Sequence, residues 1–248
     1  MHHVRLAKER QDRELQIARG IQQGLLPKTL QAPPGFDVAA RSESCFEVGG
    51  DYYDLVPLES GRLGLVVADV SGKGTPASLL MASVHAWVQA LAGGVSPPAL
   101  MKRLNRFLYQ NTQPNRYVTL FYSELDPATR RLSYVNAGHV PPFVLGSGGR
   151  ASQRLTEGGP VLGLLEDADF EAGELELQVG DMVAILSDGA TEALSPQEEE
   201  FGDARVHAAL RPATSAKAAL EALFAAVHEW VGARGRSDDL TALILAAS

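Results

Sequence analysis

The sequence has little cysteine and no long apolar run. Its single cysteine, Cys45, excludes an internal disulfide framework and a zinc site made of several cysteines, and a lone thiol suits a reducing cytosol. The most apolar run, residues 63–70, is far shorter than the ~20 residues that a membrane-spanning helix needs. No apolar stretch follows the basic N-terminal residues, so no secretory signal is expected. We therefore expect a cytoplasmic protein that does not insert into membranes.

Aromatic residues and positive charge are also scarce. Aromatic residues make up 6% of the 248 residues, so the core must consist mainly of Ala, Leu and Val. The 22 Lys and Arg residues are outnumbered by 30 Asp and Glu residues, giving a formal net charge of −8. Because such a chain repels phosphate backbones, binding to nucleic acids or anionic membranes is not expected. A small phosphorylated group is not excluded, since local charge decides its binding.

Residues 4–26 are predicted to form one helix, which Pro27 ends. Its first half is highly charged, and a narrow apolar stripe then follows at Leu15, Ala18, Ile21 and Leu25. A stripe of this width leaves open whether the helix docks on the following domain or pairs with a second copy. We divide the chain into an N-terminal regulatory or linker helix, residues 1–30, and one domain, residues 31–248.

Beyond this helix, strands mostly follow strands. Strands are predicted at residues 36–44, 52–58, 63–70, 117–125, 131–136, 143–145, 174–179, 182–186 and 240–246. Helices are predicted to begin at Pro76, Pro97 and Ser215. Tight turns are expected at Gly61, Asp126-Pro127 and Gly180-Asp181. This order indicates an α+β fold with mainly antiparallel sheets, and not an alternating β-α-β arrangement.

Aspartates recur at the ends of the apolar strands. They are Asp51 after Gly49-Gly50, Asp69, Asp188 and the pair Asp238-Asp239. An acidic side chain at the rim of a core is costly to ionise unless another charge compensates it. Several of them together indicate carboxylates gathered around cations. Oxygen ligands without a cysteine cluster favour Mg²⁺ or Mn²⁺ over zinc.

Other catalytic patterns are absent or incomplete. The segment Gly72-Lys73-Gly74-Thr75 does not fit the phosphate-loop pattern, because Gly74 separates Lys73 from Thr75. The sequence also has no GxSxG nucleophile motif and no GxGxxG motif opening a strand–helix unit. A serine hydrolase and a dinucleotide-binding enzyme are therefore not expected.

The ordered motifs resemble the metal-dependent serine/threonine phosphatases of type 2C, the PPM superfamily, and more closely its bacterial SpoIIE-like and RsbU-like branch. The matching segments are Gly49-Gly50-Asp51-Tyr52-Tyr53-Asp54, Ala68-Asp69-Val70-Ser71-Gly72-Lys73-Gly74, Asn136-Ala137-Gly138-His139, Ser187-Asp188-Gly189-Ala190-Thr191-Glu192-Ala193 and Asp238-Asp239-Leu240-Thr241. The resemblance covers about residues 15–247. It implies a four-layer α-β-β-α sandwich with a two-metal site between the sheets.

The resemblance also implies roles for individual residues. Two Mn²⁺ or Mg²⁺ ions would be held by Asp51 and Asp69 as shared ligands, the Val70 carbonyl, Asp188, and Asp238 or its neighbour Asp239. The family pattern favours the first acidic residue of the last pair, Asp238. The catalytic residues would be Asp51, Asp69 and Asp188, with water activated by the two ions attacking the phosphate. The eukaryotic histidine after Asp69 and the phosphate-binding arginine have no counterpart, so the leaving-group acid stays unassigned.

The implied function is a protein serine/threonine phosphatase in a stress or sigma-factor partner-switching system. Its substrate would be a phosphorylated regulatory protein, such as an anti-sigma factor antagonist. Two alternatives stay open: a catalytically silent binding module, and a phosphoesterase for small molecules. Acidic residues at every expected ligand position argue against the first. In this branch the helix before the domain commonly links to a sensor domain, so residues 1–30 are expected to transmit a signal by pairing into a homodimer or by moving against the core.

Several further polar residues are ambiguous. His139 is interpreted as a structural hydrogen-bonding residue rather than one that orients a loop at the site. Glu192 either supports the ligands or caps a short helix, and Lys73 either attracts phosphate or decorates a loop. Cys45 is expected to be a small residue within a strand.

Overall fold

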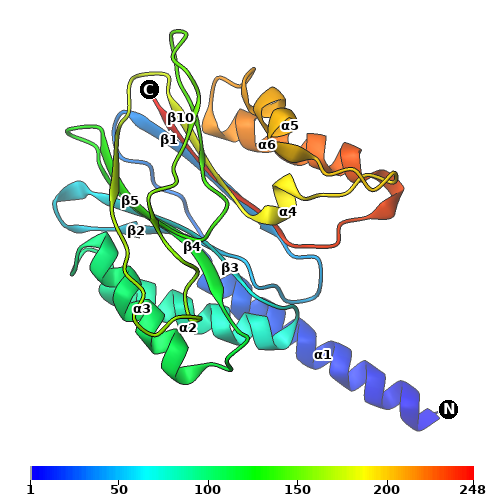
Figure 1. Cartoon of the computed structure of the whole chain (residues 1–248). Coiled ribbons are helices and arrows are strands. Elements are labelled where there is room, and N and C mark those ends of the chain that lie inside the picture. Colours follow the sequence, from blue (N-terminus) through cyan, green and yellow to red (C-terminus); the bar gives the residue numbers. More distant parts are fainter. Residues whose placement is uncertain (1) are drawn as a thin grey trace.

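Two sheets lie face to face between two layers of helices (Figure 1). The computed structural model describes residues 2–248, and within them every side chain except those of residues 2–7 and 11. Helices α2 (Thr75–Leu91) and α3 (Pro97–Asn111) cover one sheet, while α5 (Gly202–Leu210) and α6 (Ala216–Val231) cover the other. The predicted α+β sandwich with a preceding helix is confirmed.

The first sheet contains the last strand of the chain at its centre. Its order is β1 (Phe36–Glu43), β11 (Leu240–Ala247), β10 (Met182–Leu186), β6 (Phe143–Leu145) and β7 (Gln153–Arg154). All of these neighbours pair antiparallel. Because β11 lies between β1 and β10, residues before the last strand and after the first strand meet at the same edge.

The second sheet holds the middle of the chain. Its order is β2 (Tyr52–Pro57), β3 (Leu63–Val70), β4 (Val118–Asp126), β5 (Arg131–Ala137) and β8 (Gly158–Gly159), with β9 (Gly173–Glu176) also on β5. The β5–β8 pair is parallel, and the other pairs are antiparallel. The predicted turns at Gly61 and Asp126-Pro127 join β2 to β3 and β4 to β5.

Strand β3 shows why its sequence is an unbroken apolar run. Leu65 and Val67 point into the core between the two sheets, whereas Val66 and Ala68 point into the core under α2 and α3. Successive side chains of a strand face opposite sides, so a strand buried on both faces needs apolar residues at every position. The site at the end of β3 is therefore built on a rigid, fully packed strand.

Helix α6 folds as predicted from its cap and its apolar face. The Ser215 hydroxyl accepts a hydrogen bond from the Ala218 backbone N–H at 3.1 Å, which satisfies one of the unpaired donors of the first turn. The expected core residues are all buried: Leu220, Leu223, Phe224, Val227 and Val231. Within residues 2–248, no helix combines the length and the apolar character needed to cross a membrane.

Helix α1 (His2–Leu25) meets the domain only near its C-terminal end, and its N-terminal part extends away from the sandwich (Figure 1). The predicted stripe is partly wrong, because Ile21 is 66% exposed. Leu15, Ala18 and Leu25 are half-buried as expected, and Gln22 takes the position given to Ile21. On a helix of 3.6 residues per turn, position 22 lies nearer to the centre of that stripe than position 21.

The predicted hairpin of residues 174–179 and 182–186 is wrong. Strand β9 joins β5 in one sheet, and β10 joins β11 and β6 in the other, so the chain crosses between sheets at this turn. The buried Asp181 carboxylate explains the crossing, because it accepts backbone N–H groups from Ser147 at 2.8 Å and Gln178 at 2.9 Å. These bonds tie the turn to the loop after β6.

Several short elements were not predicted. Helix α5 and the two-residue strands β7 and β8 have too little apolar periodicity to be recognised. The short helix considered at Glu192 is present as α4 (Asp188–Thr191), a single turn. Strand β9 is also shorter than expected and ends at Glu176. These differences leave the two-sheet architecture unchanged.

Leu243 on β11 tests the core between the sheets. It is 0% exposed, so Leu243→Ala is expected to lower the free energy of unfolding by about 2–5 kcal/mol through lost burial and a residual cavity. Urea unfolding in chelator measures this. The control Val179→Ala, at a side chain 62% exposed, is expected to stay within about 0.5 kcal/mol of the wild type. Equal losses in the two variants would contradict the packing described here.

Candidate functional site

Carboxylates from both sheets meet at one edge of the sandwich. Asp51 precedes β2 and Asp69 lies near the end of β3, in one sheet. Asp188 follows β10, and Asp238-Asp239 precede β11, in the other sheet. Asp69 interacts electrostatically with Asp188, Asp238 and Asp239, and the neighbouring Asp51 side chain also affects its pKa. The structure thus brings together all the predicted aspartates, from segments as far apart as residues 51 and 239.

The pKa values of these carboxyl groups are raised, because the groups are buried close to one another with too few cations to balance their charge. Burial raises the pKa of Asp51 well above its usual range, and Asp69 and Asp239 raise it further, against hydrogen bonds from Thr241 and Ser187. Burial also raises the pKa of Asp69 to about 7, with the charges of Asp188, Asp238 and Asp239 acting in the same direction. The pKa of Asp188 is raised by burial and by Asp238. A nearby cation would offset all of these shifts.

Glycines let the backbone approach these carboxylates closely. A Cβ atom at Gly50 would lie 2.7 Å from the Val70 carbonyl oxygen, and one at Gly49 would overlap the Asp239 carboxylate. A Cβ atom at Gly189 would overlap the Asp239 carbonyl. The Gly49-Gly50 pair therefore lets the chain directly before Asp51 pack against the Val70 carbonyl, the backbone group predicted as a ligand.

The neighbours Asp238 and Asp239 have different surroundings. Asp239 is 7% exposed, and its two oxygens accept the backbone N–H groups of Cys45 at 2.7 Å and Gly50 at 2.9 Å. The Asp238 side chain is 46% exposed, and its Oδ2 is 2.8 Å from the Lys73 ammonium. Asp239 is thus used to anchor the loop before β2, while Asp238 faces the open side of the site.

Lys73 is a cation in contact with the cluster. It comes from the loop between β3 and α2, and its Nζ donates both to Asp238 and to the Ser237 carbonyl. The hydrogen bond to Asp238 raises the pKa of Lys73. Neither interpretation from the sequence anticipated this contact, which joins the loops of the two sheets across the site.

The donor set suits a hard divalent cation in its chemistry. It consists of carboxylates and a backbone carbonyl, and the buried Asp51 Oδ2 has no hydrogen-bond partner. Among the side chains that the structure describes, however, no group of three or more His, Cys, Asp or Glu is arranged to hold a metal ion as it stands. Asp238 is directed at Lys73 and Asp239 at backbone N–H groups. Metal binding would therefore require Asp238 to turn away from Lys73.

Two cavities open beside the cluster. One has a volume of about 190 Å³ and is lined by Asp188, Glu192, Glu200, Arg236 and Asp238, among others. The other has about 280 Å³ and lies between the C-terminal end of α1 and the site, with Gln22, Glu43, Asp51 and Arg236 in its lining. Arg236 lines both cavities. The site is therefore accessible, and one approach to it runs along α1.

The remaining candidate residues have mainly structural contacts. His139 Nδ1 is 2.9 Å from the Thr119 hydroxyl, and the Asn136 side chain bonds to both the N–H and the C=O of His139. Burial lowers the pKa of His139 from 6.5 to about 4, so its ring is neutral at pH 7. Asp54 is buried, where it accepts the Tyr52 hydroxyl and the Gln89 amide. These contacts agree with the structural interpretation of His139.

Three contact residues were missed by the sequence motifs. Cys45 lies after β1 and not within a strand, and its thiol donates to the Arg236 carbonyl at 3.1 Å. Gln22 on α1 bonds to the Gly49 backbone, and Arg236 bonds to Glu43. None of these contacts follows a spacing rule, because each joins segments more than 25 residues apart in sequence.

Comparison with known proteins finds a matching family and related sequences. Residues 59–248 match the family described as Stage II sporulation protein E (SpoIIE). Among its relatives, "Phosphoserine phosphatase RsbU" of Bacillus subtilis (strain 168) is 33% identical over 180 residues, which cover 72% of this chain and 53% of RsbU. The chain thus spans about half the length of that relative.

Solved structures show the same fold at low sequence identity. The SiaA-PP2C domain of Pseudomonas aeruginosa has a TM-score of 0.83 and 22% identity, covering 98% of this chain and 99% of that one. RsbX, solved in complex with magnesium, has a TM-score of 0.67 and 17% identity, covering 89% of this chain and 99% of that one. At these identities the likeness concerns the fold alone.

The buried His139 predicts a pH dependence of stability. Its pKa of about 4 in the folded state lies below 6.5, so the unfolded chain takes up the proton first as the pH falls. The free energy of unfolding therefore does not depend on the protonation of this residue above pH 6.5 and falls by about 3 kcal/mol in total between pH 6.5 and 4. Urea unfolding from pH 7 to 4 is therefore expected to be less pH-dependent for His139→Gln than for the wild type. Parallel curves for the two proteins would contradict this.

Proposed function

Because the chain belongs to the SpoIIE family, we propose that it is a metal-dependent protein serine/threonine phosphatase. The observation that carries this proposal is the convergence of Asp51, Asp69, Asp188 and Asp238 from two sheets, with burial raising the pKa of the first three. Phosphoserine is the favoured substrate group, because the relative RsbU is named a phosphoserine phosphatase.

Two divalent ions, Mg²⁺ or Mn²⁺, would be held by these four carboxylates and the Val70 carbonyl. The unpartnered Asp51 Oδ2, the hard-oxygen donor set and the magnesium in the RsbX structure support this assignment. When bound, such ions supply a water nucleophile at neutral pH and neutralise charge on the phosphoryl group. Asp239, also a candidate ligand by sequence, is assigned a positioning role, since both of its oxygens accept backbone N–H groups.

Lys73 and the cavity beside Asp188 and Asp238 would bind the phosphate group and the side chain that carries it. If Asp238 turned away from Lys73 to hold a metal ion, the Lys73 ammonium would be free to bind a phosphate oxygen at the mouth of the site. The 190 Å³ cavity beside Asp188 and Asp238 offers room for the phosphorylated side chain. We propose a regulatory protein of the partner-switching type, such as an anti-sigma factor antagonist, as the substrate, on the strength of the RsbU relationship.

One observation favours a second candidate, a catalytically silent binding module. The described carboxylates do not form a ready ligand group, so they could serve recognition alone. A phosphoesterase for small molecules has no comparable structural support, but the same assay distinguishes it. The silent module predicts neither metal-dependent hydrolysis nor metal binding.

Replacement of Asp188 tests the phosphatase. Asp188 is proposed as a metal ligand, and even the loss of a residue that only hydrogen-bonds to a metal ligand typically costs about 10- to 100-fold. Asp188→Asn is therefore expected to lower Mn²⁺-dependent hydrolysis of a phosphoserine peptide by at least about 100-fold. Chelator is expected to abolish the wild-type activity. The matched control Asp169→Asn, whose exposed side chain pairs with Lys102, is expected to keep full activity.

The outcomes separate the candidates. Hydrolysis of an aryl phosphate but not of the peptide would favour a small-molecule phosphoesterase. A folded protein that neither binds Mn²⁺ nor hydrolyses either substrate would leave the binding module. Activity that survives in Asp188→Asn or in chelator would refute the metal site proposed here.

We also propose that residues 1–30 regulate the site through Gln22. Its side-chain amide donates to the Gly49 carbonyl at 2.7 Å and accepts the Gly49 N–H at 3.1 Å. The next residue, Gly50, donates its N–H to Asp239. A shift of α1 would thus displace the Gly49-Gly50 backbone and, through it, the carboxylate cluster. Exposed Ile17 and Ile21, four residues apart on α1, are suited to pairing with a second copy or with an upstream sensor.

Gln22→Ala tests this link. Loss of two hydrogen bonds of about 1 kcal/mol each is expected to reduce Mn²⁺-dependent activity about tenfold, because the Gly49-Gly50 backbone is less firmly placed. Gln23→Ala, at the exposed neighbouring position, is the control and is expected to retain wild-type activity.

Sedimentation of the wild type and of these two variants tests pairing through α1. Equal activities of the two variants would contradict the role of Gln22, and a wild type that stays monomeric would contradict pairing.

A further inference from the structure

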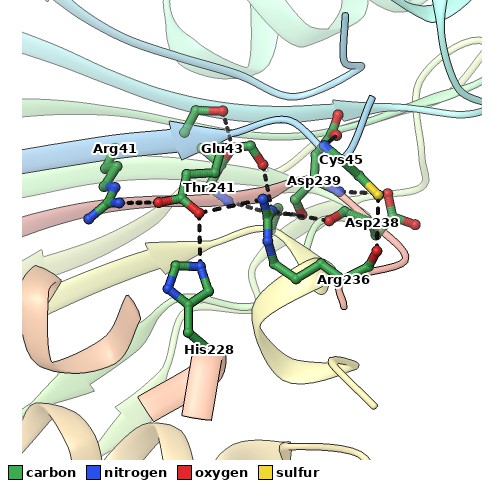
Figure 2. A network of polar contacts seen from close by, with 10 residues as sticks. Arg41, Glu43, Cys45, His228, Arg236, Asp238, Asp239 and Thr241 are labelled. Atoms are coloured by element: carbon green, nitrogen blue, oxygen red, sulfur yellow. Dashed lines mark hydrogen bonds and ion pairs between the residues drawn. The ribbon is translucent and has the colours of Figure 1, made fainter. Parts of the chain in front are cut away.

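Arg236 ties the loop that carries Asp238 to the end of strand β1. Its Nη1 donates to the Glu43 backbone carbonyl at 2.7 Å, and its Nη2 lies 3.4 Å from the Glu43 carboxylate. The Arg236 side chain is 18% exposed, and its Nη1 also lies 3.4 Å from the Asp238 carbonyl oxygen. The guanidinium thus holds its own loop and a neighbouring strand together. Figure 2 shows it between Glu43 and the Asp238-Asp239 pair.

Glu43 fixes the guanidinium in this position. Its carboxylate is shared by three cationic or potentially cationic partners: Arg236, Arg41 on the same strand, and His228 on α6, whose Nε2 lies 2.9 Å away. Figure 2 shows these partners around Glu43. Of the three, Arg236 is the one that belongs to the loop before β11. Arg41 instead stacks over the Phe224 ring, with 4.6 Å from its Cζ to the ring centroid.

Cys45 and Asp239 hold the same loop from its other side. The Cys45 thiol donates to the Arg236 carbonyl at 3.1 Å, and the Cys45 N–H donates to Asp239 at 2.7 Å. Asp239 also accepts the Gly50 N–H. The loop is therefore anchored at residues 236 and 239, on either side of Asp238. The Asp238 carboxylate is left facing Lys73 and solvent.

We propose that Arg236 is a positioning residue for the candidate metal ligand Asp238, with Glu43 as its support. The inference rests on the proposed function. An exposed ion pair would contribute little to stability and would not set the geometry. Arg236 differs from such a pair, because one guanidinium nitrogen is bonded to a strand carbonyl while the other faces a carboxylate. This forked geometry suits the planar guanidinium and cannot be reproduced by lysine.

The consequence concerns one of the two metal ions. With Arg236 shortened to an apolar side chain, the loop keeps its Asp239 anchor but loses the one at residue 236. Asp238 would then have to be ordered at the moment of binding, which would weaken the binding of an ion held by Asp188 and Asp238. The ion held by Asp51, Asp69 and the Val70 carbonyl is affected less, since those residues lie on the other sheet.

Arg236→Met tests this, with Arg41→Met as the matched control. Both remove a cation from Glu43, but only the first removes a contact to the Asp238 loop. Calorimetric titration of the metal-stripped full chain with Mn²⁺ is expected to show one site weakened by about 10- to 100-fold in Arg236→Met. The Mn²⁺ EPR spectrum is expected to lose the signature of a coupled pair at Mn²⁺ levels that fill both wild-type sites. Arg41→Met is expected to match the wild type in both measurements.

Further variants distinguish positioning from general stability. Arg236→Lys is expected to recover only part of the affinity. Glu43→Gln is expected to weaken the same site, and the double variant to be no worse than Arg236→Met alone, because both act through one contact. For the phosphoserine peptide, kcat is expected to fall while KM stays unchanged. Urea unfolding in chelator checks that each variant is folded.

The failures are distinguishable. Equal Mn²⁺ affinities of the wild type, Arg41→Met and Arg236→Met overturn the positioning role alone. Loss of stability in Arg236→Met without a change in metal affinity also overturns it, and if that variant does not fold, Arg236→Lys and Glu43→Gln decide by the same criterion. A wild type that binds no Mn²⁺ overturns the proposed function, and with it the role of Arg236.

Discussion

The packing of two sheets through a shared apolar core is the constraint on which the rest of the structure depends. One buried cluster contains side chains from both sheets, among them Leu65 and Val67 from one sheet and Ile185 and Leu243 from the other. A candidate aspartate lies at the next-to-last position of β3, two residues after β10 and directly before β11. The separation of the carboxylates is therefore set by side chains that touch no ligand. A site divided between two sheets persists only while this core holds them in register.

Bringing the carboxylates together is costly, and the structure offsets only part of the cost. Lys73 compensates Asp238, and backbone N–H groups compensate Asp239, but Asp51 keeps an oxygen without a partner. Burial and mutual repulsion raise the pKa of Asp51 and of Asp69. An uncompensated buried charge has no value for stability, so its retention is best explained by a cation or by recognition.

Local patterns account well for elements whose environment is uniform along the chain. The continuous apolar run of β3 and the capped, one-sided α6 are both predictable, and the aspartates at the strand ends correctly indicate one shared cluster. The predictions from sequence fail where contacts between segments distant in sequence determine the local structure. The β9–β10 hairpin fails because Asp181 is bonded to the loop at Ser147, and Ile21 is misplaced because Gln22 faces Gly49. Which of Asp238 and Asp239 binds metal stays a prediction.

The contacts that no motif revealed connect helices α1 and α6 to one short loop. On one side, Gln22 of α1 bonds to Gly49, and Gly50 bonds to Asp239. On the other, His228 of α6 bonds to Glu43, which supports Arg236. Both routes end within the segment of residues 236–239. Because packed elements move as units, a displacement of either helix would be passed to this loop through the Gly49-Gly50 backbone or through Glu43 at the end of β1. The loop before β11 is thus the part of the site that both helices reach through hydrogen-bonded neighbours, whereas Asp69 lies within strand β3.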